Sequence, residues 1–123
     1  MIRTIDRAAL EAGLDAGTVI VIDALPESYY LQQHLPGAIN LVADDVADRA
    51  GQLLPDKSAQ IVTYCSNASC QNSSQVAAQL ERLGYRNVSK YAAGIQDWTD
   101  AGLPTQSGTV PVRSNSPGSS PTP

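Results

Sequence analysis

Residues 61–74 read IVTYCSNASCQNSS, an apolar run that ends at Cys65 and is followed by small, polar residues. The run is β-branched and aromatic, as is typical of a short buried strand. After the polar residues, apolar side chains recur at the i, i+4, i+7 spacing of a helix, at Val76, Leu80 and Leu83. The stretch therefore predicts a strand, a loop and a helix, with Cys65 where the chain leaves the strand.

The residues after Cys65 are short and uncharged, so nothing bulky prevents their backbone from curling around the Cys65 sulfur with its N–H groups inward. Such donors, together with a helix N-terminus, favour a nucleophilic thiolate and would equally hold a persulfide. An inert buried cysteine is the alternative that the local sequence leaves open. Cys65 is the candidate catalytic residue, and the candidate binding residues are Ser66, Asn67, Ala68, Ser69, Cys70 and Gln71.

Strands and helices alternate on both sides of this stretch. Strands are expected over residues 19–23, 38–41, 61–64 and 87–91. Helices are expected after an Asp6 cap, over residues 27–33, after a cap at Asp44 or Asp45, up to Leu83, and from Ala93. The alternation predicts an α/β fold of three layers, a central parallel sheet with helices on both faces and a site at the carboxyl ends of the strands. Asp23 and Cys65 both lie at that edge.

Length and composition set broad limits. The chain has 123 residues, 42% of them hydrophobic and 16% charged, as expected for one globular domain. Its net charge of −4 argues against binding to nucleic acid or to anionic lipid. Residues 1–7 lack the apolar core of a secretory signal, and no run approaches the roughly 20 apolar residues of a membrane span. We therefore expect a cytoplasmic protein without membrane contact, and a monomer.

The C-terminal residues differ in composition from the rest of the chain. From Ser107 onward, serine, proline, glycine and threonine dominate and no periodicity is present. The sequence thus predicts a domain over residues 1–106 and a flexible tail over residues 107–123.

The single histidine and the two cysteines raise the question of a metal site. Two cysteines and His34 are too few for zinc without an additional acidic ligand, so we expect no metal. A catalytic His34 would have to reach the Cys65 sulfur, whereas a histidine just before Pro36 and Gly37 commonly bonds backbone groups of the turn. We favour a structural role near the site for His34, and likewise for Asp23.

Several stretches, in this order and spacing, resemble the rhodanese-like domain family from about Ile5 to Leu103. The stretches are residues 21–23, 26–40, 62–65, 77–88 and 93–104. The resemblance implies a rhodanese α/β fold and sulfurtransferase chemistry at Cys65. In that family the cysteine takes a sulfane sulfur from a donor such as thiosulfate and becomes a persulfide. It then passes the sulfur to cyanide in assays, or to a thiol or protein acceptor in cells, without metal or organic cofactor.

The sequence departs from the family pattern in three ways. Ala24 and Leu25 follow Asp23, where the family often has an arginine, and residues 66–75 contain neither lysine nor arginine. We therefore expect thiosulfate, a doubly charged donor, to be a poor substrate. The loop also looks longer than usual and carries a second cysteine, Cys70, which resembles a subset of the family.

Two roles for Cys70 follow from its place in the loop. It can resolve the Cys65 persulfide by releasing sulfide and forming a disulfide, which makes a redox function conceivable. Alternatively, its side chain packs under the loop as a spacer, and this is the role we favour.

Two other functions compete with sulfur transfer. A noncatalytic interaction module would use the Cys65 loop or the tail to dock a partner, and the missing basic residues favour it. Phosphatase or arsenate-reductase chemistry ranks last, because such enzymes usually clamp the oxyanion with an arginine in the loop.

Overall fold

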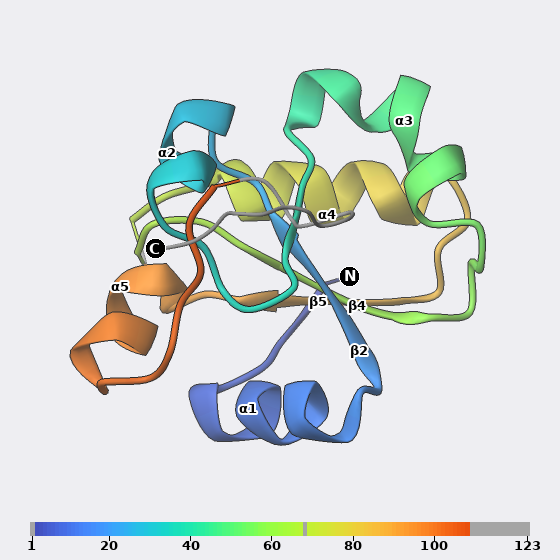
Figure 1. Cartoon of the computed structure of the whole chain (residues 1–123). Helices are drawn as coiled ribbons and strands as arrows, with labels where there is room; N and C mark the ends of the chain where they lie inside the picture. The colour runs from blue at the N-terminus through green and yellow to red at the C-terminus, as the bar shows by residue number, and fades with distance from the viewer. Residues whose placement is uncertain (1, 68, 109–123) are drawn as a thin grey trace, which may run out of the picture.

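A five-stranded parallel sheet forms the centre of the molecule in the computed structural model, which describes residues 2–67 and 69–108. The strand order is β1-β5-β4-β2-β3, so β4 is central and pairs with β2 and β5 (Figure 1). The strands are β1 (Arg3–Thr4), β2 (Val19–Asp23), β3 (Ile39–Asn40), β4 (Gln60–Tyr64) and β5 (Asn87–Tyr91). The predicted parallel sheet is confirmed.

Three strands differ from the sequence prediction, β4 by a single residue. β1 was not predicted, because two polar residues at a sheet edge leave no apolar pattern. β3 is shorter than the expected 38–41, because the Ala38 N–H is used in a turn with the Leu35 carbonyl at 3.0 Å. The strand that borders the site, β4, begins one residue earlier than expected and ends where predicted.

Helices cover both faces of the sheet, as the sequence predicts. They are α1 (Arg7–Ala16), α2 (Glu27–Gln32), α3 (Val46–Leu53), α4 (Asn72–Arg82) and α5 (Gly94–Asp100), with a 3₁₀ turn, η1 (Ala43–Asp45), before α3. In Figure 1, α1 and α5 lie on one side of the sheet, and α3 and α4 lie on the other. No helix in the described part of the chain is long and apolar enough to cross a membrane.

Two hydrophobic clusters fill the spaces between the layers. On the face of α3 and α4, Ile22 and Ile61 pack with Leu80. On the opposite face, Val21 and Trp98 belong to the second cluster. Neighbouring residues of β2 thus point into different cores, which explains why the strand is apolar without alternation.

The helix ends follow the sequence closely except at α3. The Asp6 carboxylate accepts from the Ala9 N–H at 2.8 Å and caps α1, and Gly84 follows the C-cap of α4 with φ of 100°. The prediction that the Asp44 or Asp45 side chain caps α3 is wrong, because neither side chain bonds a backbone N–H at its start. Asp45 does occupy the N-cap of α3, but its φ of −103° and ψ of −5° continue the 3₁₀ turn, and no side-chain bond forms.

The end of the domain is tied back to its middle. His34 and Gln106 exchange both backbone hydrogen bonds at 2.8 Å, and Trp98 donates its indole N–H to the Pro104 carbonyl at 2.8 Å. Gly108, which belongs to the predicted tail, also donates its N–H to the Leu31 carbonyl at 2.7 Å, so the boundary at residue 106 stays a prediction. The predicted tail is described only as far as residue 108, and residues 109–123 lie outside the described part.

Candidate active site

Cys65 follows directly on the central strand, at the carboxyl edge of the sheet. Its side chain is buried, and its carbonyl accepts from the Ile95 N–H at 2.9 Å. The next carbonyl, of Ser66, accepts from the Gln96 N–H at the same distance. The first turn of α5 therefore holds the beginning of the loop in place.

This attachment requires a glycine at the start of α5. Gly94 has a φ of +74°, and a Cβ there would lie 2.7 Å from backbone atoms of Cys65, Ser66 and Asn67. Such a distance does not occur between real Cβ and backbone atoms, so the loop and α5 approach too closely for a side chain. Gly94 belongs to residues 93–104, one of the stretches that resemble the family. The reason why a glycine is needed there is the contact with residues 65–67, which are distant in the chain.

The sulfur of Cys65 is bonded to the sulfur of Cys70, with the two Cα atoms 6.2 Å apart. Neither cysteine of the chain is a free thiol in this structure. The Cys70 side chain is thus bonded to Cys65 in this structure, and its role in the reaction stays a prediction. A turn that begins at Asn67 brings Cys70 back to Cys65, because the Asn67 carbonyl accepts from the Cys70 N–H at 3.1 Å.

The loop amides do not all surround the sulfur. The N–H of Ser69 donates to the Asn67 side chain at 3.0 Å, and that of Cys70 donates to the Asn67 carbonyl. The expectation that the whole loop points its N–H groups at the sulfur is wrong for these two. Ala68 lies outside the described residues, and Gln71 occupies the N-cap of α4, where its carbonyl accepts from Gln75.

The N-terminus of α4 provides a second source of hydrogen-bond donors. The Ser73 hydroxyl lies 3.7 Å from Cys65 Sγ and can donate to it, and Ser73 is buried. Thr63 fixes this turn by donating from Oγ1 to the Ser73 carbonyl at 3.0 Å. The Gln71 side chain makes no hydrogen bond to the first N–H groups of α4. The Cys65 sulfur lies beside Ser73 in this first turn, where the helix dipole is positive.

A lysine reaches the same turn from the neighbouring strand. Lys90 of β5 lies opposite Thr63 in the parallel register, so both side chains project toward α4. The Lys90 ammonium donates to Ser74 Oγ at 2.8 Å. A positive charge thus lies at the first turn of α4, although the loop itself contains none. The sequence prediction did not include Lys90. Its position beside α4 depends on the pairing of β4 with β5, which no pattern within the loop reveals.

Asp23 ends β2 beside Tyr64 and is buried. Its carboxylate accepts from the Tyr64 hydroxyl at 2.6 Å and from the Leu25 N–H at 2.8 Å. The same hydroxyl accepts from the Leu35 N–H at 3.1 Å. Burial raises the pKa of Asp23 above its ordinary value, against the lowering effect of its hydrogen bonds. These contacts hold the chain after β2 to the chain after α2.

His34 is buried beside Tyr30 and bonds the backbone. Its Nδ1 lies 2.8 Å from the Tyr30 carbonyl, and its ring stacks on the Tyr30 ring with centroids 4.0 Å apart. These contacts join α2 to the following turn and do not involve Cys65. Within residues 2–67 and 69–108, no group of three or more His, Cys, Asp or Glu side chains is arranged to hold a metal ion.

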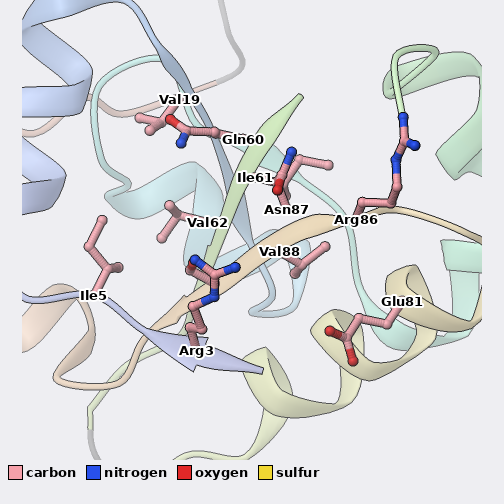
Figure 2. A pocket seen from close by; sticks show the side chains of 11 residues that line it. Arg3, Ile5, Val19, Gln60, Ile61, Val62, Glu81, Arg86, Asn87 and Val88 are labelled. Carbon is pink, nitrogen blue, oxygen red and sulfur yellow. The ribbon is translucent and has the colours of Figure 1, made fainter. Parts of the chain in front are cut away.

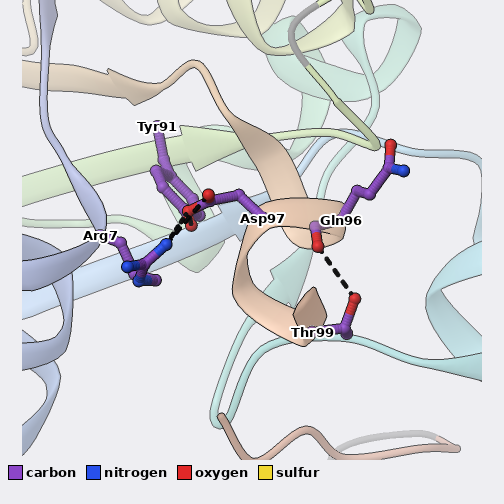
Figure 3. A network of polar contacts seen from close by, with 5 residues as sticks. All are labelled: Arg7, Tyr91, Gln96, Asp97 and Thr99. Carbon is purple, nitrogen blue, oxygen red and sulfur yellow. Dashed lines mark hydrogen bonds and ion pairs between the residues drawn. The ribbon is translucent and has the colours of Figure 1, made fainter. Parts of the chain in front are cut away.

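A polar network anchors the helix that carries Gly94. Arg7 of α1 binds the Asp97 carboxylate at 3.0 Å, and the Tyr91 hydroxyl donates to the same carboxylate at 2.5 Å (Figure 3). The Tyr91 hydrogen bond, followed by Arg7, lowers the pKa of Asp97. Helices α1 and α5 and strand β5 are thereby joined beneath the loop.

A shallow hollow of 440 Å³ lies at the same edge of the sheet as Cys65, beside the start of α4. Its lining includes Asn72 and two carboxylates, Glu27 and Asp44, and no lysine or arginine among residues 2–67 and 69–108. A second cavity, of 130 Å³, lies at the opposite edge, at the amino ends of β2, β4 and β5 (Figure 2). Of these two, the first lies at the edge that carries Cys65, and its two carboxylates disfavour anions.

Comparisons with known proteins agree on one family. A family model described as "Rhodanese-like domain" matches residues 6–101. The HTH-type transcriptional regulator Rv0324 of Mycobacterium tuberculosis is 36% identical over 104 residues, which are 85% of this chain and 45% of the regulator. The thiosulfate sulfurtransferase PspE of Escherichia coli is 37% identical over 76 residues, which are 62% of this chain and 70% of PspE.

A solved structure gives the same result for the fold. The crystal structure of the BH2092 protein from Bacillus halodurans superposes with a TM-score of 0.79 at 25% identity, covering 85% of this chain and 77% of that one. The chain spans less than half the length of the regulator, which therefore contains a further region that this chain does not match.

Proposed function

The chain belongs to the rhodanese-like domain family, and we propose that it is a sulfurtransferase that works through a persulfide on Cys65. The observation that carries the proposal is the position of the Cys65 sulfur, 3.7 Å from Ser73 Oγ at the N-terminus of α4. A helix N-terminus stabilises an anion, and both the thiolate and the persulfide are anions. A monomeric, cytoplasmic protein without cofactor is part of the same proposal.

The reaction begins from the reduced loop. The Cys65 thiolate attacks the sulfane sulfur of the donor, the donor's S–S bond breaks, and its electron pair leaves with the donor's remaining thiolate or sulfite. The sulfane sulfur is then bound to Cys65 Sγ as a persulfide. A thiol acceptor attacks this outer sulfur and regenerates the Cys65 thiolate. The donors at the start of α4 stabilise the negative charge at Sγ in both steps.

The charges around the site favour a weakly charged donor. Glu27 and Asp44 line the adjacent hollow, and the described loop residues carry no cation. Lys90, bonded to Ser74, is the cation that the structure brings to this turn. One ammonium against two carboxylates gives little net attraction for a dianion, so we propose small persulfides as better donors than thiosulfate.

A turnover assay tests the proposal. The reduced full chain is mixed with a thiol acceptor and with either thiosulfate or a small persulfide, and release of sulfite or of the donor thiol is measured. We expect turnover with the persulfide, slower turnover with thiosulfate, and none with the Cys65→Ser variant. Equal rates for the wild type and Cys65→Ser would contradict the proposal.

A second candidate function is supported by the regulator relative. The named transcriptional regulator is 36% identical to this chain over a region that forms 45% of the regulator. A rhodanese-like domain that docks a partner and performs no turnover fits that similarity. Partner capture that survives Cys65→Ser, together with no turnover from any donor, would select this function over sulfur transfer.

A further inference from the structure

We propose that Cys70 is the resolving nucleophile of the reaction: its thiolate attacks the Cys65 persulfide, releases the outer sulfur as sulfide and leaves the Cys65–Cys70 disulfide. The inference rests on the proposed persulfide chemistry and extends it. It assigns a product, a resting state of the loop and the chemical class of the molecule that must restore the thiols.

The loop is built to bring the two sulfurs together. Cys70 Sγ is bonded to Cys65 Sγ, and the Asn67 turn produces this approach through two hydrogen bonds, from the N–H groups of Ser69 and Cys70. Gly94 allows the first turn of α5 to hold the loop's other end. A Cys70 thiolate thus starts next to the atom that it must attack, which gives it an advantage over any acceptor from solution.

The resolving step balances without an external oxidant. The Cys70 thiolate attacks Cys65 Sγ, the inner sulfur of the persulfide, and forms the disulfide bond. The bond between Sγ and the outer sulfur breaks, and its electron pair leaves with the outer sulfur as hydrosulfide. The sulfane sulfur is reduced by two electrons, and the two cysteine sulfurs are oxidised by the same number.

The burial of the two cysteines indicates how the loop is reset. Cys65 is 1% exposed, whereas Cys70 is only partly buried. An incoming thiolate therefore reaches Cys70 Sγ first and displaces the Cys65 thiolate, the leaving group that lies beside the N-terminus of α4. A dithiol completes the reduction, because its second thiol displaces Cys70 from the mixed disulfide. The required partner is thus a dithiol reductant.

A single-turnover experiment without reductant tests the proposal. The full chain is reduced, freed of reductant without oxygen, and mixed with a small persulfide donor. Sulfide is then trapped and counted, and the intact mass is measured after alkylation. Cys70→Ser is the test variant, and Ser58→Ala, at an exposed position just before the amino end of β4, is the control. A wild-type sample without donor must keep both thiols alkylatable.

For the wild type and Ser58→Ala we expect one sulfide per chain and a disulfide that resists alkylation until a dithiol is added. Cys70→Ser should release at least tenfold less sulfide and retain the mass of one added sulfur atom. A wild type that keeps the added sulfur and releases no more sulfide than Cys70→Ser would overturn the resolving role while leaving the persulfide chemistry intact. Failure of both proteins to take up sulfur would overturn the proposed function, and this inference with it.

Discussion

Two neighbouring strands end side by side at the carboxyl edge and hold their last functional groups in different ways. The Asp23 carboxylate, after β2, is buried and held by hydrogen bonds from Tyr64 and Leu25. The Cys65 sulfur, after β4, is held by a covalent bond to Cys70 that thiols can exchange. The first arrangement fixes a position, and the second allows a reversible reaction. The comparison gives the Asp23 end a part in holding the fold, and the Cys65 end is where we propose that the chemistry takes place.

The largest effect on this difference between the two strand ends is expected from a substitution at Gly94, where α5 contacts the Cys65 loop. Gly94→Ala places a Cβ 2.7 Å from three backbone atoms at a positive φ, so we expect more than tenfold slower sulfur transfer. It should also lower the free energy of unfolding by more than the roughly 1–3 kcal/mol that backbone strain alone costs. Urea unfolding and donor turnover measure the two effects.

Gly102→Ala is the matched control for that substitution. Gly102 has a similar φ of +76°, but no atom lies within 4 Å of the position of its Cβ. It should lose stability through backbone strain alone and keep its rate of sulfur transfer. Equal losses of activity in the two variants would contradict the role assigned to the contact between Gly94 and the loop.

The Asp23 end should respond in stability and not in chemistry. Tyr64→Phe leaves a buried carboxylate oxygen and the Leu35 N–H without this partner, so we expect a loss of about 1–3 kcal/mol in unfolding free energy. Tyr85→Phe is the control, because its hydroxyl donates only to neutral carbonyls, of Ala50 and Leu54. Tyr85→Phe should lower the free energy of unfolding by less than Tyr64→Phe does. A Tyr64→Phe protein that stays folded but loses sulfur transfer would show that the two strand ends are not separate in function.

The same carboxylate predicts a pH dependence. Burial raises the pKa of Asp23 in the native state, so the native protein binds this proton more tightly than the unfolded chain. Its contribution to stability is therefore present below the unfolded pKa and is lost as pH rises through the native pKa. Relative to Asp23→Asn, the wild type should gain stability as pH falls through the native pKa toward the unfolded pKa, as measured by urea unfolding at each pH. An opposite slope would contradict the burial effect.

The smallest predicted effect concerns donor charge. Lys90→Met removes the ammonium at the first turn of α4, and we expect KM for thiosulfate to rise about threefold, as a charge interaction of about 0.5–1 kcal/mol predicts. KM for a small persulfide, which carries one negative charge where thiosulfate carries two, should rise less. Lys57→Met is the control, since Lys57 bonds the Leu83 carbonyl at the other end of α4. Equal effects of the two substitutions would rule out a local role for Lys90.

The sequence predicted most of the fold because its signals are local. The apolar run before Cys65 and the Gly84 after α4 depend on near neighbours, and both are found where expected. The site was predicted less completely. The contacts of Gly94 and Lys90 with the loop and with α4 join segments that are distant in the chain, so no local pattern reveals them.

The loop itself shows the same limit. Its small residues allow several backbone paths, and the sequence alone cannot choose between amides that face the sulfur and amides that bond Asn67. The latter arrangement, for Ser69 and Cys70, is what brings the second cysteine to Cys65. The loop residues predicted as a binding site remain a prediction, with Ser73 added from the structure.

The central claim is that Cys65 is the residue that accepts sulfur, and peptide mapping tests it most directly. Reduced Cys70→Ser protein, which cannot form the disulfide, is exposed to a small persulfide, alkylated and digested. We expect the peptide that contains Cys65 to gain the mass of one sulfur atom and to lose it on treatment with a thiol. A folded protein whose Cys65 peptide gains no sulfur from a persulfide, from thiosulfate or from a cysteine desulfurase would contradict the account.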